Sequence, residues 1–455
     1  MPLARSVPTA RTALILLLSI NLMNYVDRQI LSALEKPIAD EFGVGTDLTG
    51  WLPTAFLLAY MVFAPVFGVL ADRMSRWAIV GIGVIAWSLA SGGSGLVGTF
   101  AMLVVMRLLI GIGEAAYGPV APTLIADAYP VERRGKVLAW FYAAIPVGSA
   151  IGYVVGGQFH QHWHWAFYLT VPPGIALGLW ALLLRDPRHD GRRSSVVKRP
   201  DAATSVADSS RVDLHSSAAH AAASVDPTSP DHLSPAPVDD DAPPALAKPR
   251  YWDLLRIRSY VFVSLGMTAM TFALGGIAYF MPRWLEGRGL NPATATTIFG
   301  AISASAGLVA TLAGGWLGDK LRPRFPGSYF LVSGVGMLVG FPLFVLLLYC
   351  PFPLAWVVLF ATVFCLFLNT GPSNAVIANV TAAGIRATAF AANIFVIHVL
   401  GDAISPPIIG YVAKHYGGLD RGFLVVSGAI ALGGIFWLLG IPHLARDTAA
   451  IEGKP

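Results

Sequence analysis

Long apolar runs separated by short polar connectors dominate this chain of 455 residues. Each run has about 20 residues, enough for a helix of roughly 30 Å, the thickness of the hydrocarbon core of a bilayer. The pattern predicts spans at about 12–34, 49–71, 77–97, 100–125, 135–158, 163–184, 258–283, 293–318, 328–349, 353–377, 386–413 and 420–443. We therefore expect an all-α integral membrane protein with twelve transmembrane helices.

The stretch between the sixth and seventh spans has a different character. Residues 185–257 lose hydrophobic periodicity and are rich in Ala, Ser, Asp, Pro and His, which predicts a disordered linker. The predicted domains are thus an N-terminal six-helix bundle (1–184), this linker, and a C-terminal six-helix bundle with a short tail (258–455).

Composition and charge agree with a membrane protein. Hydrophobic residues make up 55% of the chain and charged residues 13%, against roughly 25% charge in soluble domains. The net charge of +5 comes from basic residues scattered through connectors, so we expect no nucleic-acid partner. Most of them lie on the side of the N-terminus, whereas the other side has Lys36, Arg283, Arg288, Lys414 and Arg421. This bias predicts that both termini and the linker are cytoplasmic, in the inner (plasma) membrane.

Ionisable side chains lie inside two of the apolar runs. Asp27 and Arg28 are in the first span, and Arg107 and Glu114 are in the fourth. Each charge at membrane depth costs about 2.5 to 3.5 kcal/mol on the mildest insertion scale, so these residues are functional candidates. Helix geometry puts Asp27, Arg28 and Arg107 at one level, with Glu114 on the same face as Arg107 about 10 Å nearer the cytoplasm.

A ladder of carboxylates and guanidinium groups would load or release a proton when a guanidinium moves between partners. Asp27 and Glu114 are therefore the predicted proton-coupling residues. Two structural interpretations stay open. Asp27 and Arg28 would simply neutralise each other or mark a helix end, or Arg107 and Glu114 would form a fixed buried salt bridge that sets helix packing.

A weak internal repeat relates the two halves. Gly68-Val-Leu-Ala-Asp72-Arg73 follows the second span, and Gly315-Trp-Leu-Gly-Asp319-Lys320 follows the eighth. Both resemble the loop signature of the major facilitator superfamily, and Arg107-Leu-Leu-Ile-Gly111-Ile-Gly113 resembles a second signature of it. The resemblance implies the major facilitator fold, two six-helix bundles related by pseudo-two-fold symmetry, and secondary transport around a midplane site.

A closer resemblance, to the spinster family of that superfamily, rests on segments in both halves. They are Asn24-Tyr-Val-Asp27-Arg28, Gly113-Glu114-Ala, Ala121-Pro-Thr-Leu-Ile-Ala-Asp127, Ile145-Pro-Val-Gly-Ser-Ala-Ile-Gly152-Tyr and His398-Val-Leu-Gly401-Asp402-Ala-Ile-Ser-Pro406. The chain is similar to bacterial spinster-like lysolipid transporters, although its long linker departs from them. The resemblance implies alternating-access transport of lysophospholipid or sphingosine-phosphate type lipids, which is proton-linked in some members.

The superfamily resemblance also implies a cytoplasmic gate, a latch between the two halves when the cavity opens outward. We expect Asp72 to lie against the positive N-terminal end of the eleventh helix near Arg386, and Arg76 to pair with Asp127. The predicted gate residues are Asp72, Arg73, Arg76, Asp127, Asp319 and Arg386. Alternatively, the motif residues only shape a tight basic turn.

An asymmetry between the halves shapes the expected substrate. The first half supplies the intramembrane charges, whereas the facing half offers mainly apolar groups beside His398 and Asp402. Charge on one wall and apolar side chains on the other favour an amphiphile. The predicted substrate-binding residues are Tyr25, Arg28, Arg107, Met270, Phe395 and His398.

Other classes of function fit less well. The sequence contains no zinc-protease helix motif, nucleophile elbow or phosphate loop, so we expect no enzyme activity and no cofactor. His160, His162 and His164 have no acidic partner within their outer loop, and we expect no metal site. The expected partners are a lipid-like substrate and protons, with the chain acting as a monomer. The main alternative is a proton-coupled carrier for a small organic acid, sugar or drug.

Overall fold

The fold is known from a computed structural model, which describes residues 7–186, 251–382 and 385–452. The predicted linker lies largely outside these ranges. Its last residues, Tyr251–Arg256, form a 3-10 helix (η3) in which Leu254 is buried, so disorder was the wrong expectation for this short segment.

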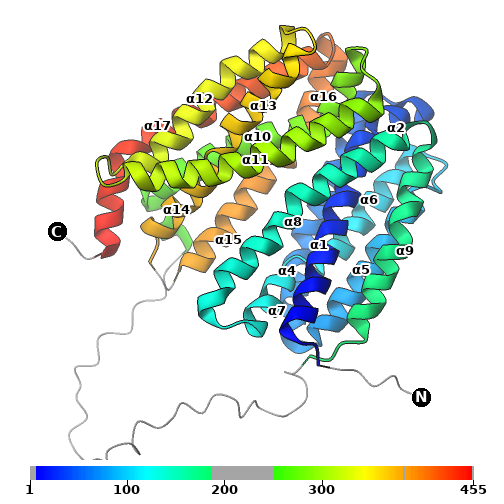
Figure 1. Ribbon diagram of the computed structural model, residues 1–455, viewed down its shortest axis with the longest axis horizontal. Coiled ribbons are helices and arrows are strands. Elements are labelled where there is room, and N and C mark those ends of the chain that lie inside the picture. The colour runs from blue at the N-terminus through cyan, green and yellow to red at the C-terminus, as the bar shows by residue number, and fades with distance from the viewer. Residues whose placement is uncertain (1–6, 187–250, 383–384, 453–455) are drawn as a thin grey trace, which may run out of the picture. The chain divides into compact units, whose positions relative to one another are not determined.

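The described chain is helical throughout both halves (Figure 1). The first half contains α1 (Ala10–Ala33), α2 (Glu35–Phe42), α3 (Thr46–Thr49), α4 (Trp51–Arg73), α5 (Arg76–Ser94), α6 (Phe100–Ala115), α7 (Ala121–Ala128), α8 (Val131–Gln158), the 3-10 helix η1 (His160–His162) and α9 (Trp163–Leu182). The second half contains α10 (Arg258–Gly287), α11 (Pro292–Leu321), α12 (Ser328–Tyr349), α13 (Leu354–Phe367), α14 (Thr370–Val380), α15 (Arg386–Ile397), the π-helical segment η4 (His398–Asp402), α16 (Ser405–Tyr416) and α17 (Leu419–Glu452).

Eleven helical stretches in the described part of the chain are long and apolar enough to span a membrane. The predicted fourth span is absent from this set because it is broken into α6 and α7. Pro119 and Pro122 lie at the break. Each proline lacks an N–H donor and clashes with the preceding turn, so an uninterrupted helix is disfavoured there. With α6 and α7 counted as one interrupted span, the fold is the expected arrangement of twelve transmembrane helices.

Each half packs mainly on itself. In the first half α1 packs against α8 and α9, α5 against α6 and α9, and α4 against α6. In the second half α10 and α12 pack against α17, and α11 packs against α13. This grouping gives the two six-helix bundles expected from the sequence.

The bundles meet along α8 and α11, which lie side by side in Figure 1. A Cβ atom on Gly157 would lie 1.9 Å from the Thr296 hydroxyl oxygen, and one on Gly300 would lie 3.1 Å from Ala150 Cα. Glycine at these positions therefore lets the two backbones approach closely, as small residues do in membrane helix interfaces.

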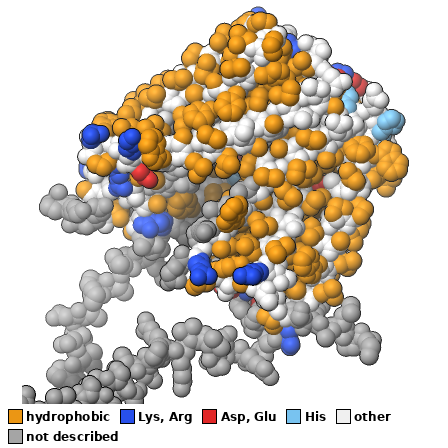
Figure 2. Space-filling model, in the orientation of Figure 1, with side chains coloured by type: hydrophobic (Ala, Val, Ile, Leu, Met, Phe, Trp, Pro, Cys, Tyr) orange, Lys and Arg blue, Asp and Glu red, His pale blue; other side chains and the backbone are white. Residues whose placement is uncertain are grey.

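The bundles also meet where α3 packs against α16 and α1 against α10. We call the end of the bundles that holds α2, α3 and η1, away from the start of α1, the outer end. Hydrophobic side chains cover most of the face in Figure 2, as expected for contact with lipid.

Candidate functional site

A cavity of about 260 Å³ lies between the two bundles. It is lined by side chains from α1, α4, α6 and α10 and from the π-helical segment η4. The polar residues of its lining are Tyr25, Asp27, Arg28, Gln29, Ser32, Arg107, Glu114, Tyr279, His398 and Asp402. All five predicted proton-coupling and first-half substrate-binding residues therefore meet here with the predicted His398. Segments of π-helix, such as η4, are frequent at functional sites.

Glu114 is paired with Arg28 across two helices. Arg28 donates from Nε at 2.9 Å and from Nη2 at 2.6 Å to Glu114 Oε2. The Glu114 side chain is fully buried, whereas 27% of the Arg28 side chain is exposed. Aromatic rings surround the guanidinium, with its carbon 4.5 Å from the Phe56 ring centroid and 5.1 Å from that of Tyr25. These contacts hold Arg28 in the cavity wall through ion pairing and cation–π attraction.

This pairing differs from both structural interpretations of the sequence. Arg28 contacts Glu114 and not its neighbour Asp27, and Arg107 and Glu114 form no ion pair within 4.0 Å. Two helical turns separate Arg107 from Glu114 on α6, about 10 Å along the axis. The guanidinium of Arg28, which comes from α1, is the one that reaches Glu114. A fixed Arg107–Glu114 salt bridge is thus wrong for this conformation.

Asp27 and Arg107 are buried without an ion-pair partner among the described residues. Asp27 accepts a hydrogen bond of 3.3 Å from the Ser91 hydroxyl. Arg107 donates to the Ser94 hydroxyl at 2.6 Å, and its guanidinium carbon lies 5.2 Å from the Phe167 ring centroid. Arg107 Nε has no hydrogen-bond partner. The cavity wall therefore holds a carboxylate and a guanidinium whose charges are only partly compensated, a costly arrangement unless a ligand or a proton completes it.

The second half contributes a histidine–carboxylate pair. His398 Nδ1 lies 3.0 Å from both carboxylate oxygens of Asp402 within η4. A Cβ on Gly275 would lie 2.7 Å from Asp402 Cβ, so glycine at this position of α10 admits the aspartate. Asp402 was expected beside His398 on one helix face, but it was not among the predicted binding residues.

Two other predicted substrate contacts lie elsewhere in this conformation. The lining of the charged cavity includes neither Met270 nor Phe395 in the part of the chain that the structure describes. Met270 is buried in the hydrophobic core, and Phe395 is 58% exposed. Their contact with a substrate stays a prediction.

Arg76 is the best-connected of the predicted gate residues. Its side chain is buried, with Nη1 2.7 Å from Asp127 Oδ2 and Nε 3.0 Å from Asp186 Oδ2. The expected contact with Asp127 is therefore present, and Asp186 was not anticipated. Arg76 and Asp127 belong to the first half, and Asp186 follows α9 at the start of the predicted linker. This ion-pair cluster therefore fastens α5 to α7 and to the segment after α9.

The remaining gate residues are exposed. Asp72 and Arg73 lie at the end of α4, and Asp319 and Arg386 are also exposed. Asp319 accepts a hydrogen bond of 2.7 Å from the Tyr329 hydroxyl, and Arg386 donates to the Thr381 carbonyl at 3.2 Å. These contacts stay within the second half, so a latch between the halves is not formed by them in this conformation and remains a prediction.

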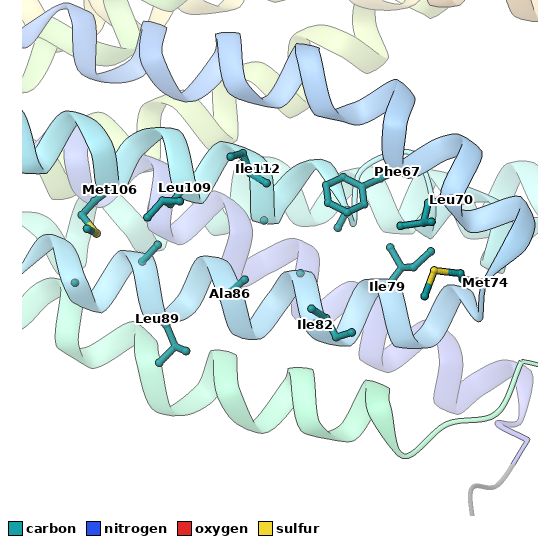
Figure 3. A pocket seen from close by; sticks show the side chains of 15 residues that line it. Phe67, Leu70, Met74, Ile79, Ile82, Ala86, Leu89, Met106, Leu109 and Ile112 are labelled. Carbon is teal, nitrogen blue, oxygen red and sulfur yellow. The ribbon is translucent and has the colours of Figure 1, made fainter.

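A larger cavity of about 550 Å³ lies on the first bundle, between α4, α5 and α6 (Figure 3). Figure 3 shows Phe67, Ile82, Leu89 and Leu109 among its labelled apolar side chains. No charged side chain is among its lining residues in the described chain. It offers no partner for a charged headgroup, so the smaller, charged cavity is the better candidate site.

Sequence reasoning missed one group of charges. Glu35, Asp47 and Glu286 make ion pairs at the outer end with basic residues of the opposite bundle. The available signal was the presence of acidic residues beside the few basic residues on that side of the membrane.

Comparison with known proteins identifies the family to which the chain is similar. Residues 17–406 match the model of the Major Facilitator Superfamily. The chain is 33% identical over 430 residues to protein spinster homolog 1 of Homo sapiens, covering 89% of this chain and 73% of that protein. It is 30% identical over 409 residues to protein spinster of Drosophila melanogaster, covering 87% of this chain but only 60% of that protein.

A further relative carries a substrate in its name. The sphingosine-1-phosphate transporter SPNS2 of Mus musculus is 29% identical over 465 residues, covering 95% of this chain and 77% of that protein.

Solved structures agree on the fold. A bacterial homolog of the human lysosomal transporter spinster, in an inward-facing and unoccupied conformation, matches with a TM-score of 0.72 at 19% identity over 98% of both chains. A D-xylose–proton symporter matches with a TM-score of 0.65 at 15% identity over 95% of this chain and 98% of that one.

Proposed function

This chain belongs to the spinster family of the major facilitator superfamily, and on that premise we propose that it carries an amphiphilic lipid across the inner (plasma) membrane by proton-coupled alternating access. Membership of this superfamily makes it a multi-pass membrane transporter and not an enzyme. The lipid class, the proton and the inner membrane are the parts that we propose.

The observation that carries the substrate proposal is the environment of Arg107. Its buried guanidinium lines the charged cavity, contacts one hydroxyl, and has a free Nε donor. Such a group is completed by an anionic acceptor such as a phosphate, and a charge-assisted hydrogen bond in a dry site is among the stronger polar contacts. The relative named above is a sphingosine-1-phosphate transporter, whose substrate bears a phosphate, and this supports a phosphate-bearing lipid as the substrate class.

The amphiphile part rests on the setting of that charge. The cavity of about 260 Å³ is the size of a headgroup and not of a whole lysolipid. An acyl chain would therefore extend from it along apolar side chains, which Met270 and Phe395 of the second half are proposed to supply. A small organic acid or sugar would need no such extension, and this is the alternative that an experiment must separate.

The proton proposal rests on Asp27 and Glu114. Asp27 has no ion-pair partner within the described residues, whereas Glu114 depends on Arg28. An anionic headgroup that attracts Arg28 would leave Glu114 without its cation, and a buried carboxylate in that state is stabilised by taking up a proton. The substrate anion and the Glu114 carboxylate would thus compete for the Arg28 guanidinium, and substrate binding would favour proton uptake by Glu114.

Counterflow in proteoliposomes tests the substrate class. Lysophospholipids of several chain lengths should exchange, whereas sugars and short organic acids should not. Arg107→Ala should weaken binding of a phosphate-bearing lysolipid by about tenfold to a hundredfold, from the roughly 1.5 to 3 kcal/mol of a hydrogen bond to a charged group. Arg446→Ala, which removes an exposed arginine at the chain's end, is the control. Exchange of a sugar or short acid with no response to lysolipids would refute the lipid assignment.

Transport measured across a range of pH tests the coupling residues. Asp27→Asn and Glu114→Gln keep the shape of each side chain but cannot exchange a proton, so each should abolish the pH dependence of transport. Since coupled sites share their titration, the double variant is the stricter test. A parental pH profile in all three variants would remove proton coupling from these residues.

A further inference from the structure

Ion pairs join the two bundles at the outer end. Arg283 of α10 places Nη1 2.9 Å from both carboxylate oxygens of Glu35 on α2. Glu286 of α10 lies 3.3 Å from Lys36 and 3.0 Å from His160 of the first bundle. These contacts can exist only while the outer ends of the bundles are together.

Other contacts extend the same seal. Lys414 of α16 pairs with Asp47 of α3 at 3.0 Å, and the Thr46 hydroxyl donates to the Gly410 carbonyl at 2.8 Å. A Cβ on Gly410 would lie 2.0 Å from the Thr46 carbonyl oxygen, so the two backbones are in close contact.

Glu35 differs from the other carboxylates of the seal. Its side chain is completely buried, whereas the side chains of Asp47 and Glu286 are 21% and 19% exposed. The Thr49 hydroxyl donates to Glu35 Oε1, and the Tyr279 hydroxyl donates to the Thr49 carbonyl at 2.7 Å, which fixes the surroundings of the carboxylate from both bundles. A carboxylate so enclosed must be paired with a cation or protonated, because an isolated buried charge costs several kcal/mol.

Arg283, in contrast, has access to water. About 23% of its side chain is exposed, and it lines a cavity of about 440 Å³ at the outer end. Loss of its partner would therefore leave a hydrated cation and not a buried one. The two members of the pair are unequal: Glu35 needs either Arg283 or a proton, whereas Arg283 needs neither.

We propose that Glu35 is a further proton-binding carboxylate of the transport cycle, and that it holds the outer ends of the bundles together either as an ion pair with Arg283 or as a neutral acid. This goes beyond the proposed lipid and proton transport through Asp27 and Glu114, and it does not depend on which substrate is carried.

The charges around Glu35 decide how the seal responds to pH. Burial raises the pKa of the Glu35 carboxyl above its ordinary value, while Arg283 and the Thr49 hydrogen bond oppose that rise and Asp40 on α2 adds to it. Lys36 on the same helix is engaged by Asp40 and Glu286, and Asp47 of α3 pairs with Lys414 of α16. Arg283 is thus the cation in direct contact.

The direction in which pH changes the stability of the seal follows from the two environments of Glu35. In the sealed state the carboxyl has its raised pKa, and when the outer ends separate, hydration returns it towards the ordinary value. The sealed state therefore binds the proton more tightly. Protonation of Glu35 stabilises the sealed state, and this stabilisation is complete when the pH is below the ordinary pKa that the carboxyl has in the open state. The stabilisation is lost as the pH rises through the raised pKa that the carboxyl has in the sealed state. Arg283 maintains the seal above that range.

The test measures the distance between spin labels at Leu96 and Tyr349. Both positions are exposed, with 77% and 71% exposure, and they follow α5 and end α12 on opposite bundles. Cys350 and Cys365 are replaced by alanine, and the full-length protein is studied without substrate from about pH 5 to pH 8. The longer distance reports separation of the outer ends.

Arg283→Gln should make the seal strongly pH-dependent, because Glu35 then needs a proton. We expect the ratio of sealed to open protein to fall at least about tenfold between the acidic and alkaline ends of the range. Glu35→Gln with Arg283→Gln should stay sealed at every pH. Arg288→Gln is the matched control, because Arg288 pairs with Asp420 of its own bundle.

A distance distribution that does not change with pH in Arg283→Gln, or a double variant that opens as that single variant does, would overturn the proposal. If Arg283→Gln fails to give monodisperse protein, the comparison is made in His160→Gln protein, in which the Glu286–His160 contact cannot titrate. Glu35→Gln must then remove the remaining pH response, and a response that persists overturns the proposal. If Glu114→Gln abolishes the pH dependence of transport but Arg283→Gln shows no pH response of the outer distance, the role of Glu35 is refuted while the proposed function stands.

Discussion

The central cavity and the outer seal use the same chemistry for different purposes. In each, an arginine meets a fully buried glutamate at 2.6 to 2.9 Å. Arg28 and Glu114 both belong to the first bundle, so their pair survives when the bundles move apart. Glu35 and Arg283 belong to opposite bundles, so their pair must break. An ion pair within one rigid body can serve binding and proton exchange throughout the cycle, whereas one between two bodies selects a conformation.

The largest effect is expected from a variant that breaks the central ion pair between Arg28 and Glu114. Arg28→Met should lower the free energy of unfolding by about 3 to 5 kcal/mol, because it leaves the buried Glu114 carboxylate without its cation. Thermal or denaturant unfolding in detergent measures it. Arg28→Met combined with Glu114→Gln should recover most of the loss. If the double variant is no more stable than Arg28→Met, the two residues are not coupled as the contact implies.

An intermediate effect acts on the seal through shape and not through charge. Gly410→Ala places a methyl group against the Thr46 backbone, where overpacking typically costs about 1 to 3 kcal/mol. That cost applies only while the outer ends are together, so the distance between labels at Leu96 and Tyr349 should lengthen.

The control for this variant is Gly428→Ala, because a Cβ at Gly428 meets nothing within 4 Å. Gly428→Ala should leave the distance unchanged. Equal distances in the two variants would mean that the contact between α3 and α16 does not resist opening.

The smallest effect comes from the exposed part of the seal. Lys414→Gln removes an ion pair in which the lysine side chain is 46% exposed and that of Asp47 is 21% exposed. Solvent-exposed pairs contribute about 0.2 to 1 kcal/mol and are screened by salt. The sealed population should therefore change by a factor of about five or less, and less again at high salt. A shift as large as that of Arg283→Gln would show that burial is not what distinguishes Glu35.

Much of the fold could be predicted from the pattern of apolar and polar residues along the sequence. A span of about 20 apolar residues is a property of local sequence, because every backbone polar group in a bilayer must be satisfied within its own helix. The positions of the spans, the two halves and the placement of Asp27, Arg28, Arg107 and Glu114 at membrane depth could therefore be predicted. The interruption at Pro119 and Pro122 was also visible in the sequence, but apolar composition alone does not register it.

The partners of the charged groups depended on tertiary structure. Helix periodicity fixes which face of α6 carries Arg107 and Glu114, but not which residue of another helix reaches that face. The rotation of α1 relative to α6 places Arg28 in an ion pair with Glu114, whereas Arg107 donates a hydrogen bond to Ser94. A long guanidinium side chain spans several ångströms, so small differences in helix rotation and depth change its partner.

The sequence by itself determined that this is a twelve-helix membrane protein whose intramembrane charges are concentrated in its first half, because length, apolarity and the position of each ionisable residue are local properties. Only the tertiary structure decided that Glu35 faces Arg283, since the two are 248 positions apart. Two residues so distant meet only through the packing of one bundle against the other, which no local pattern encodes.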